Sequence, residues 1–217
     1  MARIEHLVTS GTFSLDGGTW DVDNNVWIVG DDTEVIVIDP AHDPRAVAEA
    51  VAGRSVRAIL LTHGHDDHIR AVRETATLLG DAPVHLNDAD RHLWDMVHDG
   101  AAPAGTITAD SSFEVGGVTL QALLTPGHSP GSTCFYVAEG LEWDGQARPV
   151  VFSGDTLFNG GPGATGRSYS SFNTIIESIS AVLFALPEDT VVLTGHGDPT
   201  SLGAEKPHLQ EWIDRGY

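Results

Sequence analysis

The chain has 217 residues and a formal net charge of −20 at pH 7, since 31 Asp and Glu residues face only 11 Lys and Arg residues. A surface this acidic argues against nucleic acid and anionic membranes as partners, because few side chains are present to neutralise phosphates. Cys134 is the one cysteine, which excludes an intramolecular disulfide, and the lack of an apolar leader or a membrane-spanning run makes the cytoplasm the expected compartment.

The first half of the chain alternates short apolar runs with helical stretches. We expect strands over residues 4–10, 26–29, 34–38, 58–61 and 83–86, of which the β-branched run at 34–38 is the clearest. We expect helices over residues 45–51, after Pro44, over 68–79, and from Asn87 or Asp88 to about His98.

The second half opens with strands and closes with helices. Gly116-Gly117 predicts a hairpin turn between strands over 113–115 and 118–124. Further strands are expected over 133–138, 149–152 and 190–193, a glycine-rich loop over 154–166, and helices over 171–186 and 205–213. This mixed order predicts an α+β protein whose sheets are covered by helices. No linker interrupts the pattern, so we expect a single domain over residues 1–217, whose oligomeric state the sequence leaves open.

The most informative stretch is Thr62-His63-Gly64-His65-Asp66-Asp67-His68. It directly follows the apolar strand over 58–61, and ligands bind at the carboxyl ends of strands in open α/β sheets. Neutral imidazole and carboxylate are the ligands that Zn²⁺, Fe or Mn prefers when no thiolate is offered. Residues i and i+2 of an extended backbone point the same way, so His63 and His65 can reach one ion together, while Asp67 and His68 turn toward a second.

Three more predicted strands end in a metal-binding side chain. His128 follows the strand over 118–124, Asp155 follows the strand over 149–152, and His196 follows the strand over 190–193. Each lies among glycines, which let the backbone approach closely. A lone loop histidine is more often a solvated residue, but four strand ends with the same chemistry favour one shared metal centre.

These motifs resemble those of the metallo-β-lactamase-fold hydrolases, and within them the glyoxalase II-like (hydroxyacylglutathione hydrolase-like) branch. The resemblance covers nearly the whole chain, from the strand over 35–39 to Gly195-His196-Gly197. It implies a four-layer αββα sandwich with the site at one edge. It also implies two metal ions, the first held by His63, His65 and His128, the second by Asp67, His68 and His196, with Asp155 bridging both.

The resemblance further implies a hydrolytic reaction. β-Lactamases of this fold lack the bridging aspartate, so Asp155 argues against antibiotic hydrolysis. Two divalent ions, Zn²⁺ first with Fe or Mn as substitutes, would share a water and lower its pKa toward ~7. The resulting metal-bridging hydroxide would attack the carbonyl of a thioester. Asp67 would serve as a base only if a single metal were bound.

The thiol that carries the acyl group is expected to differ from glutathione. Glyoxalase II itself holds glutathione with basic residues of a C-terminal helical extension, whereas Lys206 and Arg215 are the only lysine and arginine in residues 197–217. The resemblance therefore points to a small-molecule thioester of another low-molecular-weight thiol. Mycothiol and bacillithiol esters, including an S-formyl adduct, are the candidates.

The loop over residues 159–167 is expected to shape the substrate mouth. There Arg167 or Tyr169 could contact a substrate carboxylate or carbonyl, the alternative being a surface loop with an exposed arginine. Asp39, at the end of a strand beside the motif, is expected to orient metal ligands, or else simply to cap a turn.

Two other activities fit the same ligand set. A lactonase of the superfamily, acting on acyl-homoserine-type lactones, would place Tyr169 near the metals. A persulfide dioxygenase would need a single iron, for which His63, His128 and Asp155 would suffice.

Overall fold

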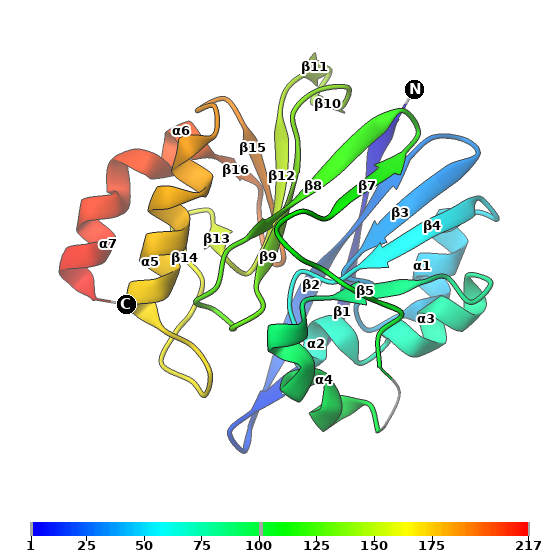
Figure 1. Ribbon diagram of the computed structural model, residues 1–217, viewed down its shortest axis with the longest axis horizontal. Coiled ribbons are helices and arrows are strands. Elements are labelled where there is room, and N and C mark those ends of the chain that lie inside the picture. Colours follow the sequence, from blue (N-terminus) through cyan, green and yellow to red (C-terminus); the bar gives the residue numbers. More distant parts are fainter. Residues whose placement is uncertain (1, 100–101, 217) are drawn as a thin grey trace.

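The computed structural model describes residues 2–99 and 102–216, in which two sheets stack face to face and helices cover their outer sides (Figure 1). The first sheet contains, in spatial order, β1 Arg3–Leu15, β2 Gly18–Gly30, β3 Glu34–Ile38, β4 Ser55–Leu60, β5 Val84–Leu86 and β6 Gly105–Thr106. The second contains β16 Thr200–Ser201, β15 Val191–Thr194, β12 Val150–Gly154, β9 Thr133–Val137, β8 Val118–Leu124 and β7 Ser112–Val115. Two short hairpins pair β10 Glu142–Trp143 with β11 Gln146–Ala147 and β13 Leu157–Phe158 with β14 Gly161–Pro162.

The helices lie in two groups (Figure 1). Beside the first sheet are α1 Pro44–Val51, α2 Asp66–Ile69, α3 Val72–Leu78, η1 Asp88–Asp90 and α4 Arg91–Val97. Beside the second are α5 Phe172–Ala181, η2 Leu183–Ala185, α6 Leu202–Glu205, η3 Lys206–His208 and α7 Leu209–Arg215.

Alternation along the strands produces the layers, because successive side chains of a strand point to opposite faces. On β3, Ile36 and Ile38 belong to the apolar core between the two sheets, whereas Val35 and Val37 pack in a separate core with residues of α1. The second sheet divides in the same way: Phe152 faces the central core, and its neighbour Val151 packs with residues of α5 and α7. The expected four-layer αββα sandwich of an α+β protein is confirmed.

Strand direction determines where the site forms. β3, β4 and β5 are parallel, so their carboxyl ends share one edge of the first sheet. In the second sheet, β12 is parallel to β15, and β8 and β12 are both antiparallel to β9. β8, β12 and β15 therefore run in the same direction, and their carboxyl ends share an edge as well. The loops that follow β4, β8, β12 and β15 carry the expected ligands.

The helix expected over residues 68–79 is wrong in two respects. Helix α2 already begins at Asp66, so Asp67 and His68 lie inside its single turn. It ends at Ile69, and a separate helix, α3, begins at Val72. No Gly or Pro marks the interruption, so the chain carries no local signal that would have placed it.

The strands expected over residues 4–10 and 26–29 are much longer in the structure. They form one continuous hairpin, paired from Arg3 with Gly30 to Leu15 with Gly18. Its turn is Asp16-Gly17, in which both residues have positive φ (53° and 79°), as a two-residue hairpin turn requires. The outer half of the hairpin alternates polar and apolar residues, with Phe13 and Leu15 on β1 and Trp20 and Val22 on β2, so the sequence carried a strand signal that the expected bounds left out.

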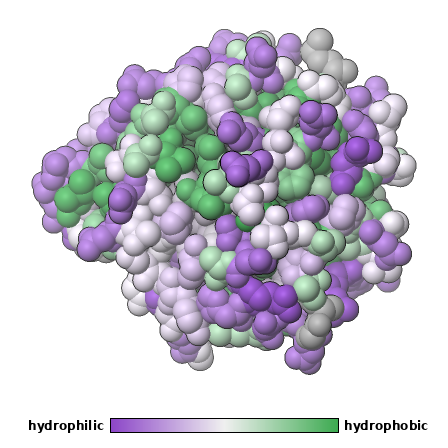
Figure 2. Space-filling model, in the orientation of Figure 1, coloured by the Kyte–Doolittle hydropathy of each residue, from purple (hydrophilic) through white to green (hydrophobic). Residues whose placement is uncertain are grey.

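No helix among the described residues is both long enough and apolar enough to cross a membrane. Figure 2 shows hydrophilic side chains spread over the visible face and hydrophobic surface confined to separate patches, one of them over α7 at the left edge, where Ile213 is exposed.

The central core makes a stability prediction. Replacing Ile36, which is fully buried between the sheets, by Ala should lower the free energy of unfolding by about 2–5 kcal/mol, because the lost contacts leave a cavity. Val8→Ala on the exposed surface of β1 is the control and should change it by less than about 0.5 kcal/mol. Urea unfolding measures both, and a loss at Ile36 no larger than the control would contradict the layer assignment.

Candidate metal centre

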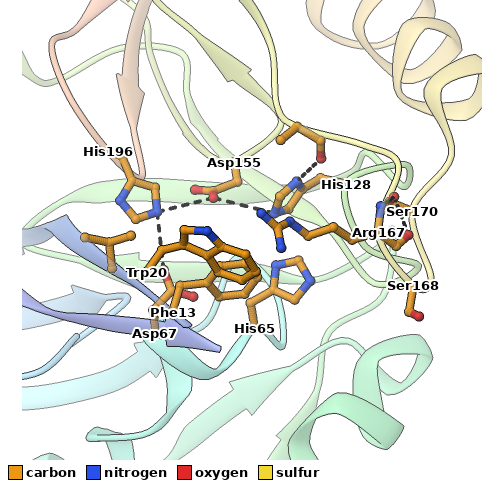
Figure 3. A pocket seen from close by; sticks show the side chains of 12 residues that line it. Phe13, Trp20, His65, Asp67, His128, Asp155, Arg167, Ser168, Ser170 and His196 are labelled. Carbon is orange, nitrogen blue, oxygen red and sulfur yellow. Dashed lines mark hydrogen bonds and ion pairs between the residues drawn. The ribbon is translucent and has the colours of Figure 1, made fainter. Parts of the chain in front are cut away.

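The seven expected ligands converge at the edge where the two sheets meet. Their ligand atoms form three groups, each with all atoms within 4.8 Å of one another: His63, His65 and His128; His63, His68 and Asp155; and Asp67, His68 and His196. Asp155 also lies within 3.5 Å of His128 and 3.3 Å of His196, so its carboxylate stands between the first and last groups (Figure 3).

Hydrogen bonds fix which nitrogen of each ring faces the centre. The Nδ1 atoms of His128 and His196 lie 2.8 Å from the carbonyl oxygen of Ala164 and 2.7 Å from that of Asp23. A carbonyl only accepts, so both Nδ1 atoms carry hydrogen and donate it. Nε2 is left in each ring as the atom that turns toward Asp155.

Hydrogen bonds also fix the ring orientations in the motif that follows β4. Thr62 Oγ1 donates its single hydrogen to Asp39 Oδ2 at 2.6 Å, so it must accept from His63 Nδ1 at 3.1 Å. His68 Nδ1 donates to the same Asp39 oxygen at 3.0 Å. Asp39 thus contacts the His68 ring directly and the His63 ring through Thr62, and its other oxygen also accepts from Thr62 N at 2.8 Å.

Several ligand atoms lack the partner that burial demands. Nε2 of His65, Nε2 of His128 and Oδ1 of Asp155 are buried and have no hydrogen-bond partner among the described residues. Buried polar atoms are normally paired, since an unpaired one costs roughly 1–3 kcal/mol. Lone pairs of imidazole and carboxylate aimed into one small space are what a divalent cation requires, so the residues fit the metal ions that the family resemblance implies.

Four of the ligand histidines form two pairs, in which the ring pKa is either lowered or raised. Burial, together with the neighbouring His68, holds the pKa of His63 well below its ordinary value, and burial with His128 lowers that of His65 to about 3. Burial also disfavours the charged form of His196, but the Asp155 carboxylate outweighs it and raises the pKa to about 10. The pKa of His68 is raised in the same way, because the carboxylates of Asp67 and Asp155 outweigh the effect of burial.

The pKa values of the two site carboxylates are lowered. Burial would raise the pKa of Asp67, yet the His68 ring beside it lowers that pKa to about 2. His196 and His68 hold the pKa of Asp155 well below its usual range, although burial acts to raise it. The site therefore keeps its carboxylates ionised and balances them with positive charge, which protons on His68 and His196 supply when no metal ion does.

A buried carboxylate that sequence reasoning missed braces the ligand loops. Asp90 accepts from Gly64 N (2.8 Å), Ser129 Oγ (2.6 Å) and Gly131 N (2.6 Å). It thereby joins the loop that carries His63 and His65 to the loop that carries His128. A Cβ at Gly64 or Gly131 would lie 2.9 and 2.7 Å from Asp90 atoms, so both glycines permit the close approach.

A cavity of about 220 Å³ opens onto the ligands. Its apolar wall is formed by Phe13, Trp20 and Val22 of the β1–β2 hairpin, which reaches over the site. Arg167 lies across the mouth with its guanidinium carbon 3.7 Å from the centre of the Trp20 ring (Figure 3). Asp16 at the hairpin tip accepts from Ser168 N at 2.9 Å, which joins the hairpin to the Arg167 loop.

Of the two expected substrate residues, the structure brings only Arg167 to the cavity. Tyr169 is absent from the lining residues, and its ring packs 4.3 Å from the ring of His92 on α4. The Tyr169 backbone lies in the left-handed region, with φ of 71°.

Sequence reasoning also missed the hairpin residues. Phe13, Trp20 and Asn24 contact or face the site, yet they come from a segment with no ligand motif. Asn24-Asn25, two amides placed directly before the apolar run at Val26, carried a usable signal, because buried amides in a strand need specific partners.

Comparison with known proteins shows the family of the chain. The sequence model of the metallo-β-lactamase superfamily matches residues 19–196, a range that contains all seven ligands. The chain belongs to the metallo-β-lactamase superfamily. The superfamily binds divalent metals and comprises metallo-hydrolases, which accords with the ligand groups described above.

Individual members of the superfamily match over most of their length. The chain is 35% identical over 189 residues to the probable metallo-hydrolase YqgX of Bacillus subtilis, covering 81% of this chain and 85% of YqgX. It is 28% identical over 190 residues to the hydroxyacylglutathione hydrolase GloC of Haemophilus influenzae, covering 81% of this chain and 86% of GloC.

Two solved structures of superfamily members are similar at 30% identity. The B3 metallo-β-lactamase BLEG-1 superposes with a TM-score of 0.73, covering 92% of this chain and 97% of that chain. TTHA1623 in a di-iron-bound form superposes with a TM-score of 0.70, covering 85% of this chain and 93% of that chain.

The raised pKa of His196 makes metal binding depend on protons. In metal-free protein at pH 7.5 this ring is protonated, because its pKa is about 10, and a metal ion needs the neutral ring. Zn²⁺ binding should therefore release at least about one proton per chain, and its affinity should rise about tenfold per pH unit for each proton released. Calorimetry in buffers of different ionisation enthalpy measures the release. A pH-independent affinity without proton release would contradict this charge assignment.

Proposed function

We propose that the protein is a dinuclear metallohydrolase that cleaves a thioester of a low-molecular-weight thiol. The observation that carries the proposal is the position of Asp155, whose carboxylate stands between two groups of ligands at the floor of an apolar cavity. The relationship to GloC, named as a hydroxyacylglutathione hydrolase, supports this reaction class.

Two of the three groups, together with the contacts of Asp155 with His128 and His196, support the ligand roles that the resemblance implies. His63, His65 and His128 would hold one ion and Asp67, His68 and His196 the other, with Asp155 contacting both. Two divalent cations, Zn²⁺ first and Fe or Mn as substitutes, would supply Lewis-acid activation of the substrate carbonyl and of the attacking water. The di-iron form of TTHA1623 supports a site for two metals and keeps iron among the choices.

The remaining cavity residues bind and orient the substrate. Phe13 and Trp20 offer an apolar wall against which an acyl chain or thiol body can pack, and they exclude water from one side of the carbonyl. Arg167 is the only lysine or arginine among the described residues that line the cavity. Its guanidinium would pair with a carboxylate or carbonyl of the substrate, and the stack on Trp20 restrains it in that position.

A covalent mechanism through cysteine does not fit the structure. Cys134 is fully buried and its pKa is raised to about 11 by burial, so the reactive thiolate is not formed at neutral pH. Its sulfur faces Thr125 Oγ1 at 3.2 Å, inside the second sheet.

The basic residues near the cavity bear on which thiol carries the acyl group. Lys206 contacts Glu188 and the carbonyl oxygen of Phe184, and it does not line the cavity. Arg167 is the one lysine or arginine in the described cavity lining, whereas glyoxalase II holds glutathione with basic residues of its extension, and this difference supports a carrier other than glutathione. We therefore place mycothiol and bacillithiol esters, including an S-formyl adduct, first.

Other activities receive less support. A lactonase was expected to use Tyr169, which the cavity does not include. A persulfide dioxygenase with one iron would leave the group of Asp67, His68 and His196 without an ion. The similarity to BLEG-1 makes β-lactams a necessary comparison substrate.

Steady-state hydrolysis across a substrate panel tests the reaction class. The zinc-loaded protein should hydrolyse S-formyl or S-lactoyl thioesters with a kcat/KM of at least about 10⁴ M⁻¹s⁻¹, the lower end for enzymes acting on their own substrates. Hydrolysis of an acyl-homoserine lactone and of a β-lactam is measured for comparison. Oxygen uptake by the iron-loaded protein with a thiol persulfide is the third comparison. Thioester turnover no faster than the background, or a faster comparison reaction, would contradict the proposal.

Replacing the central carboxylate tests its role. Asp155→Ala should lower thioester turnover by at least about 10²-fold and leave one metal ion per chain, because two cations would lose the negative charge between them. Cys134→Ala is the matched control at a buried position and should retain its metals and nearly full activity. Metal content and kcat are measured together, and unchanged values in Asp155→Ala would remove this residue from the site.

A further inference from the structure

Three consecutive polar residues, Asp23, Asn24 and Asn25, precede the apolar run of β2. Asn24 is fully buried and Asn25 is 3% exposed. Burying an amide is costly unless its donors and acceptor are paired, so the partners of these side chains show what the segment does.

The Asn24 amide has one possible orientation. Its Nδ2 atom lies 3.0 Å from Asp67 Oδ2, and an ionised carboxylate only accepts hydrogen bonds. The amide must therefore present N–H to Asp67, which leaves Oδ1 facing His42 Nε2 at 2.7 Å, and His42 must donate. Nδ2 also lies 3.3 Å from Nε2 of His68. One amide thus contacts two ligands of the same group.

The residues on either side hold the third ligand of that group. The carbonyl oxygen of Asp23 accepts from His196 Nδ1 at 2.7 Å. Asn25 Nδ2 donates to the carbonyl oxygens of Thr194 (3.0 Å) and Gly197 (2.9 Å), and Asn25 N donates to that of Gly195 (2.8 Å). A short segment of the first sheet therefore fixes the loop of the second sheet that carries His196.

The first ligand group is supported elsewhere. His63 is oriented by Thr62 and Asp39, and His128 by the carbonyl oxygen of Ala164. Asp39 also contacts His68 and is shared between the groups. Among the described residues, the Asn24 side chain hydrogen-bonds to Asp67 and His42 and lies beside His68, and it reaches none of His63, His65 and His128.

We propose that Asn24 is a positioning residue for the second metal ion and that it sets the affinity of that ion separately from the first. By donating to the Asp67 carboxylate and lying beside His68, it holds Asp67 in the position in which that carboxylate meets His68 and His196. His42 acts one step further out, because its hydrogen bond keeps the amide in the donating orientation. This inference rests on the two-metal centre proposed above.

Stepwise metal titration of the full-length protein tests the inference without any measurement of activity. Metal-free wild type and Asn24→Leu, which keeps the shape of the side chain but removes its donor and acceptor, are titrated with Zn²⁺ against a chelator and with Co²⁺ by visible absorption. The second binding step of Asn24→Leu should weaken about 10–100-fold, while the first changes by less than about threefold.

The matched control is Thr9→Val. Thr9 pairs with Asn24 across the β1–β2 ladder, is 4% exposed, and donates from Oγ1 to the carbonyl oxygen of Ala41. Losing that hydrogen bond should lower stability and leave both metal steps unchanged. A weakened second step in this control would show that the effect at Asn24 is merely structural, and would overturn the proposal.

A second variant carries the test if Asn24→Leu does not fold. His42 has φ of 55°, a conformation that Asn tolerates, so His42→Asn should preserve the backbone and remove the hydrogen bond to Asn24. Its second step should weaken about tenfold. Two unchanged steps, or equal losses in both, would overturn the inference while leaving the centre intact. Wild-type protein that binds a single ion would instead remove the two-metal centre, and the inference with it.

Discussion

Two carboxylates buried among imidazoles, Asp67 and Asp155, are the constraint on which the site depends. Ionised carboxylates in a protein interior are costly unless positive charge lies close by, and their mutual repulsion adds to that cost. Here the compensation comes from rings whose Nδ1 atoms are already committed to carbonyl or carboxylate acceptors, which leaves Nε2 to face the carboxylates. Either protons or metal ions can supply the charge, and the unpaired ligand atoms of His65 and His128 favour metal ions.

The sandwich makes this concentration of charge possible by keeping it at an edge. Each ligand follows the carboxyl end of a strand, and the parallel directions of β3 to β5, and of β8, β12 and β15, bring those ends together from both sheets. The apolar cores lie behind this edge and are built from other side chains. The β1–β2 hairpin then adds what the strand ends do not provide: an apolar wall above the ligands and a set of amides beside them.

Much of this arrangement could be predicted from the sequence because its signals are local. The unbroken apolar run before Thr62 and the spacing of His63, His65 and His68 are visible within a few residues, and repeated strand ends point to His128, Asp155 and His196. The break between α2 and α3 has no Gly or Pro to mark it. The positions of Arg167 and Tyr169 depend on contacts with Trp20 and His92, which are far away in the chain. Asp90 acts only through tertiary hydrogen bonds and has no motif of its own, whereas Asn24 is marked only by its place in a polar pair before the apolar run at Val26.

Diffraction data collected at a metal absorption edge, from crystals of protein isolated without chelator, test the central claim most directly. Two anomalous peaks are expected in each chain, one among His63, His65 and His128 and one among Asp67, His68 and His196, with Asp155 touching both. A single peak, or two peaks of which Asp155 contacts only one, would contradict that claim.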